Sequence, residues 1–380
     1  MIKIKPHLEA ARLIYEILND WRAGRPIAPE CCREVGETAE YRFILNRHAA
    51  VRERTRGEKL PYPPEEVGRV LQALVTGTTY TNSANPYFER LHGALQNAAG
   101  DLPAFREKLE ATAGIDFAGL SGRLDQVTPS WAPDLDLTVD VHLAPDLHLS
   151  AYFHEGAIGG NLLIVQVVDG RPVMVVELPP EYSGSDQPAP LILPLDETIA
   201  HETHHYLFNA LEEQESQNEG RTGTAGALVR TLASGVHGEG MATFFFSTPP
   251  ANTPNYQYWQ MTEARLGEHF RAFFDHLAGL AGAPERASSD EEFQRGFSLL
   301  FGPPPGGGTE LCYVLGTNMC RAIEAALGRQ ELVELTARRR DFYEAYNQAA
   351  QRLNSGGSNK WPGEPGRGWP LVPDAVMNCL

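Results

Sequence analysis

Long apolar runs are absent from this chain of 380 residues. It contains no run of about 18 consecutive apolar residues, the length that marks a membrane-spanning helix. The N-terminal stretch MIKIKPHLEAARLIYEILNDW has two early lysines, but charged side chains interrupt the apolar positions that follow. That pattern is typical of an amphipathic helix rather than of a signal peptide. We therefore expect a cytoplasmic protein without a membrane span.

Cysteine is scarce and poorly placed for cross-linking. The five cysteines are Cys31, Cys32, Cys312, Cys320 and Cys379, an odd number without the paired spacing of a disulfide framework or of a zinc knuckle. None of them lies in a local sequence typical of a cysteine peptidase. We expect free thiols in a reducing compartment.

Positive charge is also in short supply. Lysine and arginine total 32 residues against 49 acidic residues, which gives a formal net charge of -17 at pH 7. A surface of this sign repels nucleic acids and anionic membranes, so neither is an expected partner. Hydrophobic residues make up 42% and charged residues 21% of the chain, a balance typical of a globular protein with a large core.

Several catalytic signatures are missing as well. There is no GxSxG turn of a serine hydrolase and no GxxxxGK[ST] phosphate loop. The sequence GRTGTAG at 220–226 follows no predicted strand and lacks the spacing of a dinucleotide site. These absences direct attention to a different chemistry.

Apolar spacings of three and four residues predict helices along most of the chain. The predicted helices cover 7–21, 36–53, 65–76, 86–98, 103–112, 195–215, 225–247, 258–282, 290–301, 310–327 and 329–353. Between 126 and 194, apolar and polar residues alternate, which predicts three or four strands with a hairpin at DGRP. The sequence after Ser355 has no periodicity.

These patterns predict an α+β fold that is predominantly helical. We expect an N-terminal helical region over 1–125, a catalytic region over 126–355 and an irregular tail over 356–380. Within the catalytic region we distinguish a sheet at 126–194, metal-binding helices at 195–247 and C-terminal helices at 258–353. A small twisted sheet is expected to pack on the first metal-binding helix, with the active site between the sheet and the helical C-terminal half.

The stretch DETIAHETHHYLFNA at 196–210 contains the pattern HExxH, formed by His201, Glu202 and His205. Residues four apart share one face of a helix, so His201 and His205 can present two imidazole nitrogens to one zinc ion. Glu202 is then placed to accept a proton from the attacking water as a general base. His204 also shares a face with His201, but His205 is preferred because it leaves Glu202 in the base position.

A catalytic zinc site needs a third protein ligand and keeps one position open for water. Glu219 lies in the polar loop QNEGRTG, which would hold a ligand poorly. Glu239 lies in LASGVHGEGMATFFFS, whose apolar residues predict a buried helix that can pack against the first one. Gly238 and Gly240 flank Glu239 and allow another backbone or the first metal-binding helix to come close. Glu239 is therefore the preferred third ligand.

The residues from His201 to Ala242 resemble the gluzincin metallopeptidases. HExxH at 201–205, followed by Glu239-Gly240-x-Ala242, is similar to a group of zinc-dependent peptidases with an HExxH and a later EGxA. The stretch CYVLGTNMCRAIEAALGRQELVEL at 312–335 is also similar to that group. The resemblance implies a zincin-like fold in which His201, His205 and Glu239 hold Zn2+.

The same resemblance implies two further roles. The segment GAIGGNLLIVQVV from Gly156 corresponds to the edge strand that pairs with the extended backbone of a substrate. Tyr313 is the candidate that donates a hydrogen bond to the oxyanion of the tetrahedral intermediate, and His237 is the second choice.

We therefore expect a zinc metallopeptidase that cleaves peptide bonds by metal-activated water, with Glu202 as the general base. The expected partner is a peptide or protein substrate. Two alternatives remain open. The same metal site could hydrolyse non-peptide amides or esters, or the chain could be a catalytically inactive binding protein with a zincin fold.

Overall fold

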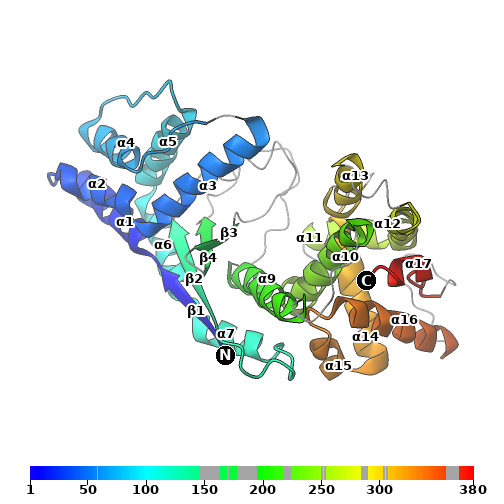
Figure 1. Ribbon diagram of the computed structural model, residues 1–380. Helices are drawn as coiled ribbons and strands as arrows, with labels where there is room; N and C mark the ends of the chain where they lie inside the picture. Colours follow the sequence, from blue (N-terminus) through cyan, green and yellow to red (C-terminus); the bar gives the residue numbers. More distant parts are fainter. Residues whose placement is uncertain are drawn as a thin grey trace. The chain divides into compact units, whose positions relative to one another are not determined.

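The computed structural model describes residues 1–57, 59–144, 163–168, 171–177, 195–216, 224–249, 251, 254–283, 290–302, 304, 307–356 and 368–380. Within these residues the protein is mostly helical and has one small sheet (Figure 1), so a predominantly helical α+β fold is confirmed. The chain divides into two compact units. One contains residues 2–121 and 138–189, and the other contains residue 1 together with residues 122–137 and 190–380.

Short helices make up most of the unit that contains residues 2–121. In chain order they are α1 (Glu9–Arg22), α2 (Pro29–Glu37), α3 (Ala39–Arg56), α4 (Glu65–Thr76), α5 (Pro86–Gly100), α6 (Leu102–Ala113) and α7 (Phe117–Asp125). Residues at the ends of several of these helices determine where the helices begin or end. The Asn85 side chain accepts a hydrogen bond from the Tyr87 N–H at the start of α5, and Gly77 ends α4 in the left-handed conformation. The helices predicted before residue 125 are confirmed, whereas α2 and α7 are additional.

The sheet of the same unit has the strands β1 (Ile2–His7), β2 (Leu137–Ala144), β3 (Leu163–Val168) and β4 (Arg171–Glu177). Their order is β1-β2-β4-β3, with β2 parallel to β4 and β3 antiparallel to β4. Val168 of β3 pairs with Arg171 of β4, which confirms the predicted hairpin. β3 therefore lies at an edge of the described sheet.

β1 lies in front of the first predicted helix, in residues for which the sequence patterns predicted no element. Ile2 and Ile4 are buried while Lys3 and Lys5 are exposed, so IKIK follows the two-residue period of a strand. The first helix begins only at Glu9. A short run of this kind is easily overlooked in front of a longer helical pattern.

The other unit is built from helices around a buried central one (Figure 1). These helices are α9 (Leu195–Ser216), α10 (Thr224–Ala242), the π-helix η1 (Thr243–Ser247), α11 (Pro254–Glu263), α12 (Leu266–Ala281), α13 (Asp290–Phe301), α14 (Leu311–Leu327), α15 (Arg329–Glu334), α16 (Arg339–Ser355) and α17 (Asp374–Met377). The central helix α14 packs against both α10 and α16. Its Leu315 and Ile323 share one apolar core with Phe273 of α12 and Tyr346 of α16.

Two predicted helices are interrupted in the structure. The helix predicted over 258–282 divides between α11 and α12, where the Thr262 hydroxyl donates a hydrogen bond to the Thr309 carbonyl at 2.6 Å. The helix predicted over 329–353 divides between α15 and α16, where Ala337 has a φ of 63°. No glycine or proline stands at either break, so the apolar periodicity runs through both.

The end of the chain is less irregular than its composition indicates. The short helix α17 lies within residues 368–380, and Trp369, Val372 and Val376 are buried in the core of the unit. Asn354 of α16 accepts a hydrogen bond from the Trp369 N–H at 2.7 Å. These contacts attach the last residues to α16.

The predicted packing of the sheet on α9 involves both units and stays a prediction, as do the region boundaries at 125 and 355. Across the described part of the chain, each helix is too short or too polar to cross a lipid bilayer. All five cysteines are free thiols.

Candidate metal centre

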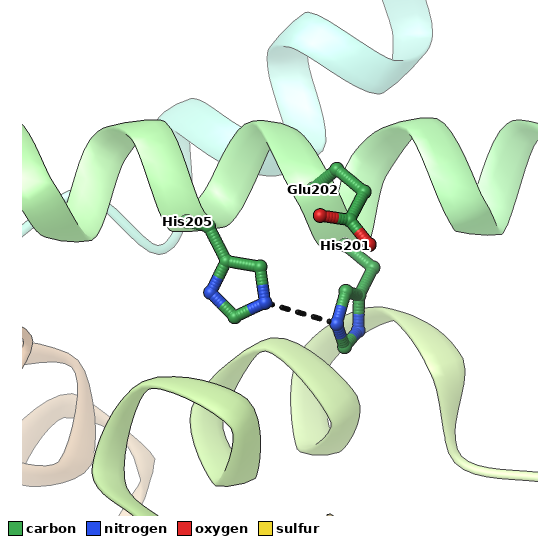
Figure 2. Close-up of side chains that lie close together, drawn as sticks. All are labelled: His201, Glu202 and His205. Atoms are coloured by element: carbon green, nitrogen blue, oxygen red, sulfur yellow. Dashed lines mark hydrogen bonds between the residues drawn. The ribbon is translucent and has the colours of Figure 1, made fainter. Parts of the chain in front are cut away.

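α9 presents the HExxH residues from one continuous helix. Its sequence contains no proline or glycine, and buried side chains such as Ile199 and Leu211 anchor it in the unit. Figure 2 shows the rings of His201 and His205 projecting from the same side of α9, with Glu202 beside His201. The Nε2 atoms of the two rings are 3.1 Å apart, because residues four apart lie one above the other on a helix.

Glu239 reaches the same point from α10. Its Oε2 atom lies 3.3 Å from Nε2 of His201 and 3.1 Å from Nε2 of His205. Two imidazole nitrogens and one carboxylate oxygen, contributed by two helices, therefore converge. The structure brings together the three side chains that the sequence indicated as metal ligands.

A polar network joins α9 to α10 beyond the cluster. The Ser234 hydroxyl donates a hydrogen bond to Glu212 at 2.9 Å, and Nε of Arg339 donates to the Ser234 hydroxyl at 2.6 Å. Arg339 also forms an ion pair with Glu212. Because Arg339 is the first residue of α16, this network links three helices and helps to keep Glu239 opposite the histidines.

Burial and ion pairing shift the pKa values of the cluster residues in opposite directions. Burial alone would raise the pKa of Glu239, but His205 and His201 outweigh it and hold that pKa well below its usual range. Burial would likewise lower the pKa of His205, but Glu239 outweighs it and raises the pKa to about 9. The His205 and Glu239 side chains, only 18% and 20% exposed, thus form an ion pair.

Glu202 lies next to this ion pair. One potential ligand atom from each of His201, Glu202 and His205 lies within 4.8 Å of the others. Burial raises the pKa of Glu202, although the two histidines oppose the effect. A carboxylate whose pKa is raised accepts a proton more readily near neutral pH, which is what a general base requires.

The donor set fits a zinc ion. Two histidines and one glutamate are a known ligand set of catalytic zinc, and they leave a further coordination position for water. The low pKa of Glu239 keeps its carboxylate in the anionic form that binds a cation. The residues present therefore meet the requirements of zinc in number and type.

Close packing of α14 on α10 brings Tyr313 near the cluster. A β-carbon on Gly240 would lie 2.4 Å from Cα of Gly316, so the two backbones touch and the predicted close approach at Gly240 is confirmed. A β-carbon on Gly238 would lie 3.8 Å from Phe208 and 3.9 Å from His205, so side chains of α9 lie beside this glycine. The ring centroid of Tyr313 lies 6.1 Å from that of His201.

Two other histidines point away from the cluster. His204 is fully buried, and its ring centroid lies 5.8 Å from that of Phe246. His237 is also fully buried and stacks on Phe342 with 4.1 Å between the centroids. Glu219, the other candidate for the third ligand, lies outside the described residues.

The sequence patterns did not indicate two residues of this site. Oγ of Ser247 lies 2.8 Å from Nδ1 of His201. Glu310 directly precedes α14, and burial, reinforced by the charge of Glu239, raises its pKa. Neither residue stands in a motif, and only the folded chain brings them to the cluster.

A groove of about 660 Å³ lies farther along α9 and α10. Its lining includes Asn209, Arg230 and Arg338–Arg340. Asn209 follows His205 by one helical turn, but the groove is lined by none of the cluster residues. The groove and the cluster are therefore separate features of one helix pair.

Comparison with known proteins gives one positive finding. Residues 156–355, more than half of the chain, match the model of a family described as "Putative zinc dependent peptidase (DUF5700)". No curated protein and no solved structure matches the chain. The matched range contains His201, Glu202, His205 and Glu239. The zinc dependence in the family's description agrees with the group of His201, Glu202 and His205, which could hold a metal ion. The chain belongs to this family.

Proposed function

We propose that this protein is a zinc metallopeptidase of the gluzincin type, with a zincin-like fold, in which His201, His205 and Glu239 hold Zn2+. The convergence of Glu239 Oε2 on the Nε2 atoms of both histidines carries the proposal. When bound, zinc supplies Lewis acidity that polarises a carbonyl group and makes water acidic enough to lose a proton near neutral pH.

Glu202 moves the proton in this proposal. Its carboxylate accepts a proton from the attacking water and then passes it to the departing amine of the cleaved peptide bond. Its position directly after His201 in α9 holds it beside the ligands. Its raised pKa suits both halves of this transfer, because the group must take up a proton and release it again.

Tyr313 is the proposed donor to the oxyanion. Burial, reinforced by the charge of Glu239, raises the pKa of Tyr313 well above its ordinary value, so its hydroxyl keeps its proton and can donate a hydrogen bond. His237 is less suited to this role because its ring is buried against Phe208 and Phe342.

An extended peptide is the proposed substrate. β3 is an edge strand of the described sheet, and an edge strand offers backbone N–H and C=O groups that can pair with another chain. Such pairing tolerates many side chains. The first part of the proposed substrate strand, residues 156–162, lies outside the described residues.

The substitution Glu202→Gln tests the proposal. Glutamine preserves the size of the side chain but cannot accept the proton, so turnover of a mixed-peptide library should fall by about 10²–10⁴-fold. Zinc content, measured by elemental analysis, should stay as in the wild type. The matched control is Glu213→Gln, an exposed position on the same helix, which should keep full turnover.

The possible results separate the candidate functions. A wild-type protein without zinc, or full turnover by Glu202→Gln, contradicts the proposal. Cleavage of non-peptide amides or esters, with peptides left intact, identifies the first alternative. A full zinc content without turnover of any of these substrates identifies an inactive binding protein.

A further inference from the structure

One helical segment contacts His201 through both of its ring nitrogens. Nε2 lies 3.3 Å from Oε2 of Glu239, and Nδ1 lies 2.8 Å from Oγ of Ser247. Glu239 belongs to α10, and Ser247 is the last residue of η1, which follows α10 without a gap. The segment therefore supplies Glu239, one proposed ligand. It also contacts the ring of His201, a second proposed ligand, at the nitrogen that does not face Glu239.

The π-helical turn explains this double contact. An α-helix turns by about 100° per residue, so eight residues of α-helix would leave Ser247 about 80° away from Glu239 around the axis. With i→i+5 hydrogen bonds, the five residues of η1 turn by only roughly 80° each, which reduces the offset to about 20°. Ser247 thus shares the face of Glu239 because the helix widens.

The contact is shielded from water. Ser247 is 2% exposed and His201 is 5% exposed, and the Ser247 hydroxyl is the partner of Nδ1 among the described residues. A buried N–H group that loses its acceptor cannot easily turn to solvent instead. The hydroxyl can accept a hydrogen bond from Nδ1–H, and it can also donate one to Nδ1 when that nitrogen carries no proton.

We propose that Ser247 is a positioning residue that selects the metal-binding tautomer of His201. A neutral imidazole ring carries one proton, on one nitrogen or the other. When Nδ1–H donates to Oγ of Ser247, Nε2 keeps a lone pair that faces the point where His205 and Glu239 meet. With the proton on Nε2, that lone pair is lost. This role rests on the proposed function, which supplies zinc as the ion.

The substitution Ser247→Ala removes the acceptor and tests this role in the full chain. Zinc affinity is measured by competition with a coloured chelator. We expect the Kd for zinc to rise by about 10- to 100-fold, the usual effect of losing a residue that orients a metal-binding histidine.

Thr248→Ala is the matched control. The Thr248 hydroxyl donates to the carbonyl of Thr243 at 3.0 Å, so this variant loosens the same π-helical turn without removing the acceptor of Nδ1. It should bind zinc about as tightly as the wild type. An equal loss of affinity in both variants would overturn the proposal, because the integrity of the turn would then be what matters.

A second measurement reports the tautomer directly. The full chain is labelled with 15N-histidine, and long-range 1H–15N NMR spectra are recorded without added metal at mildly alkaline pH, where an ordinary imidazole is neutral. The signals of His201 are identified by their loss in His201→Gln. We expect Nδ1–H in the wild type, and we expect Ser247→Ala to lose this preference.

These results distinguish the role of Ser247 from the proposed function. If the wild type binds zinc but Ser247→Ala has the same Kd, only the role of Ser247 is refuted. If the wild type binds no zinc, the proposed function is refuted. The NMR result then decides whether Ser247 has the proposed positioning role. Nδ1–H in the wild type but not in Ser247→Ala then supports the positioning role, whereas Nε2–H in the wild type overturns it.

Discussion

Individual side chains in the cluster offset the cost of one another's burial. A buried carboxylate without a partner is unfavourable, and Glu239 avoids this cost because two histidines of α9 face it. His204, one residue before His205, has no such partner among the described residues, and burial lowers its pKa well below the ordinary value. The pKa values of neighbouring histidines of one helix are therefore shifted in opposite directions because the two side chains face different surroundings.

His92 of α5 gives a prediction about acid stability. Burial lowers its pKa below the ordinary 6.5, and its Nε2 atom is buried without a hydrogen-bond partner in the described part of the chain. In the unfolded chain His92 takes up a proton at the ordinary pKa, so the unfolded state binds more protons as the pH falls. The stability that neutral His92 contributes is thus present above about pH 6.5 and is lost below it.

The variant His92→Phe keeps an aromatic ring next to Tyr80 but removes the titration. Its free energy of unfolding, measured by urea denaturation between about pH 7 and pH 5, should fall less steeply than that of the wild type. Parallel pH profiles for the two proteins would show that His92 does not bind the additional proton on unfolding.

The sequence predicts the candidate site to different degrees from residue to residue. His201, Glu202 and His205 lie within two helical turns, so local spacing was enough to place them together. Glu239 is distant in the sequence, and its selection needed an apolar helix pattern and a resemblance. Ser247 could not be predicted, because no sequence pattern marked the π-helical turn that brings it to His201.

Helix α10 is held close to α14 by two facing glycines. A β-carbon on Gly240 would lie 2.4 Å from the backbone of Gly316, which has no flexible side chain that could move aside. Gly240→Ala should therefore force the helices apart and destabilise the protein by about 1–3 kcal/mol, the usual cost of overpacking. Urea denaturation measures this change.

Gly279→Ala is the control for this prediction. Gly279 lies within α12, and a β-carbon there would have nothing within 4 Å. Alanine is the better helix former, so this variant should be more stable than the wild type by about 0.5–1 kcal/mol. A stabilising effect of Gly240→Ala would contradict the close contact between the backbones of α10 and α14.

Helices and strands were predictable where the sequence itself marks them. α4 was predicted at its observed bounds because proline precedes it and Gly77 follows it. The breaks near Arg265 and Ala337 were missed, since tertiary contacts rather than glycine or proline impose them. Apolar periodicity reports which residues face a core, but it does not report where a helix changes direction.

All of the proposed metal ligands belong to one of the two units, the one that contains residues 190–380. The strands β3 and β4 belong to the other. An ion held by His201, His205 and Glu239 should therefore stabilise the helical unit through α9 and α10, whatever the sheet contributes to substrate binding.

Removal of zinc should lower the melting temperature of the wild-type protein. Zinc at about 100 times its Kd stabilises the folded state by about 2.7 kcal/mol, which corresponds to roughly 5–10 °C for a unit of this size. Calorimetry with and without a chelator measures the shift. The variant His205→Ala should show little response, and an equal shift in that variant would mean that the ion binds elsewhere.

The most direct measurement is an anomalous-scattering map at the zinc absorption edge from crystals of the zinc-loaded protein. We expect a single strong peak about 2 Å from Nε2 of His201, Nε2 of His205 and a carboxylate oxygen of Glu239. A map without a peak among these three side chains, or with its peak at other residues, would contradict the proposed metal site.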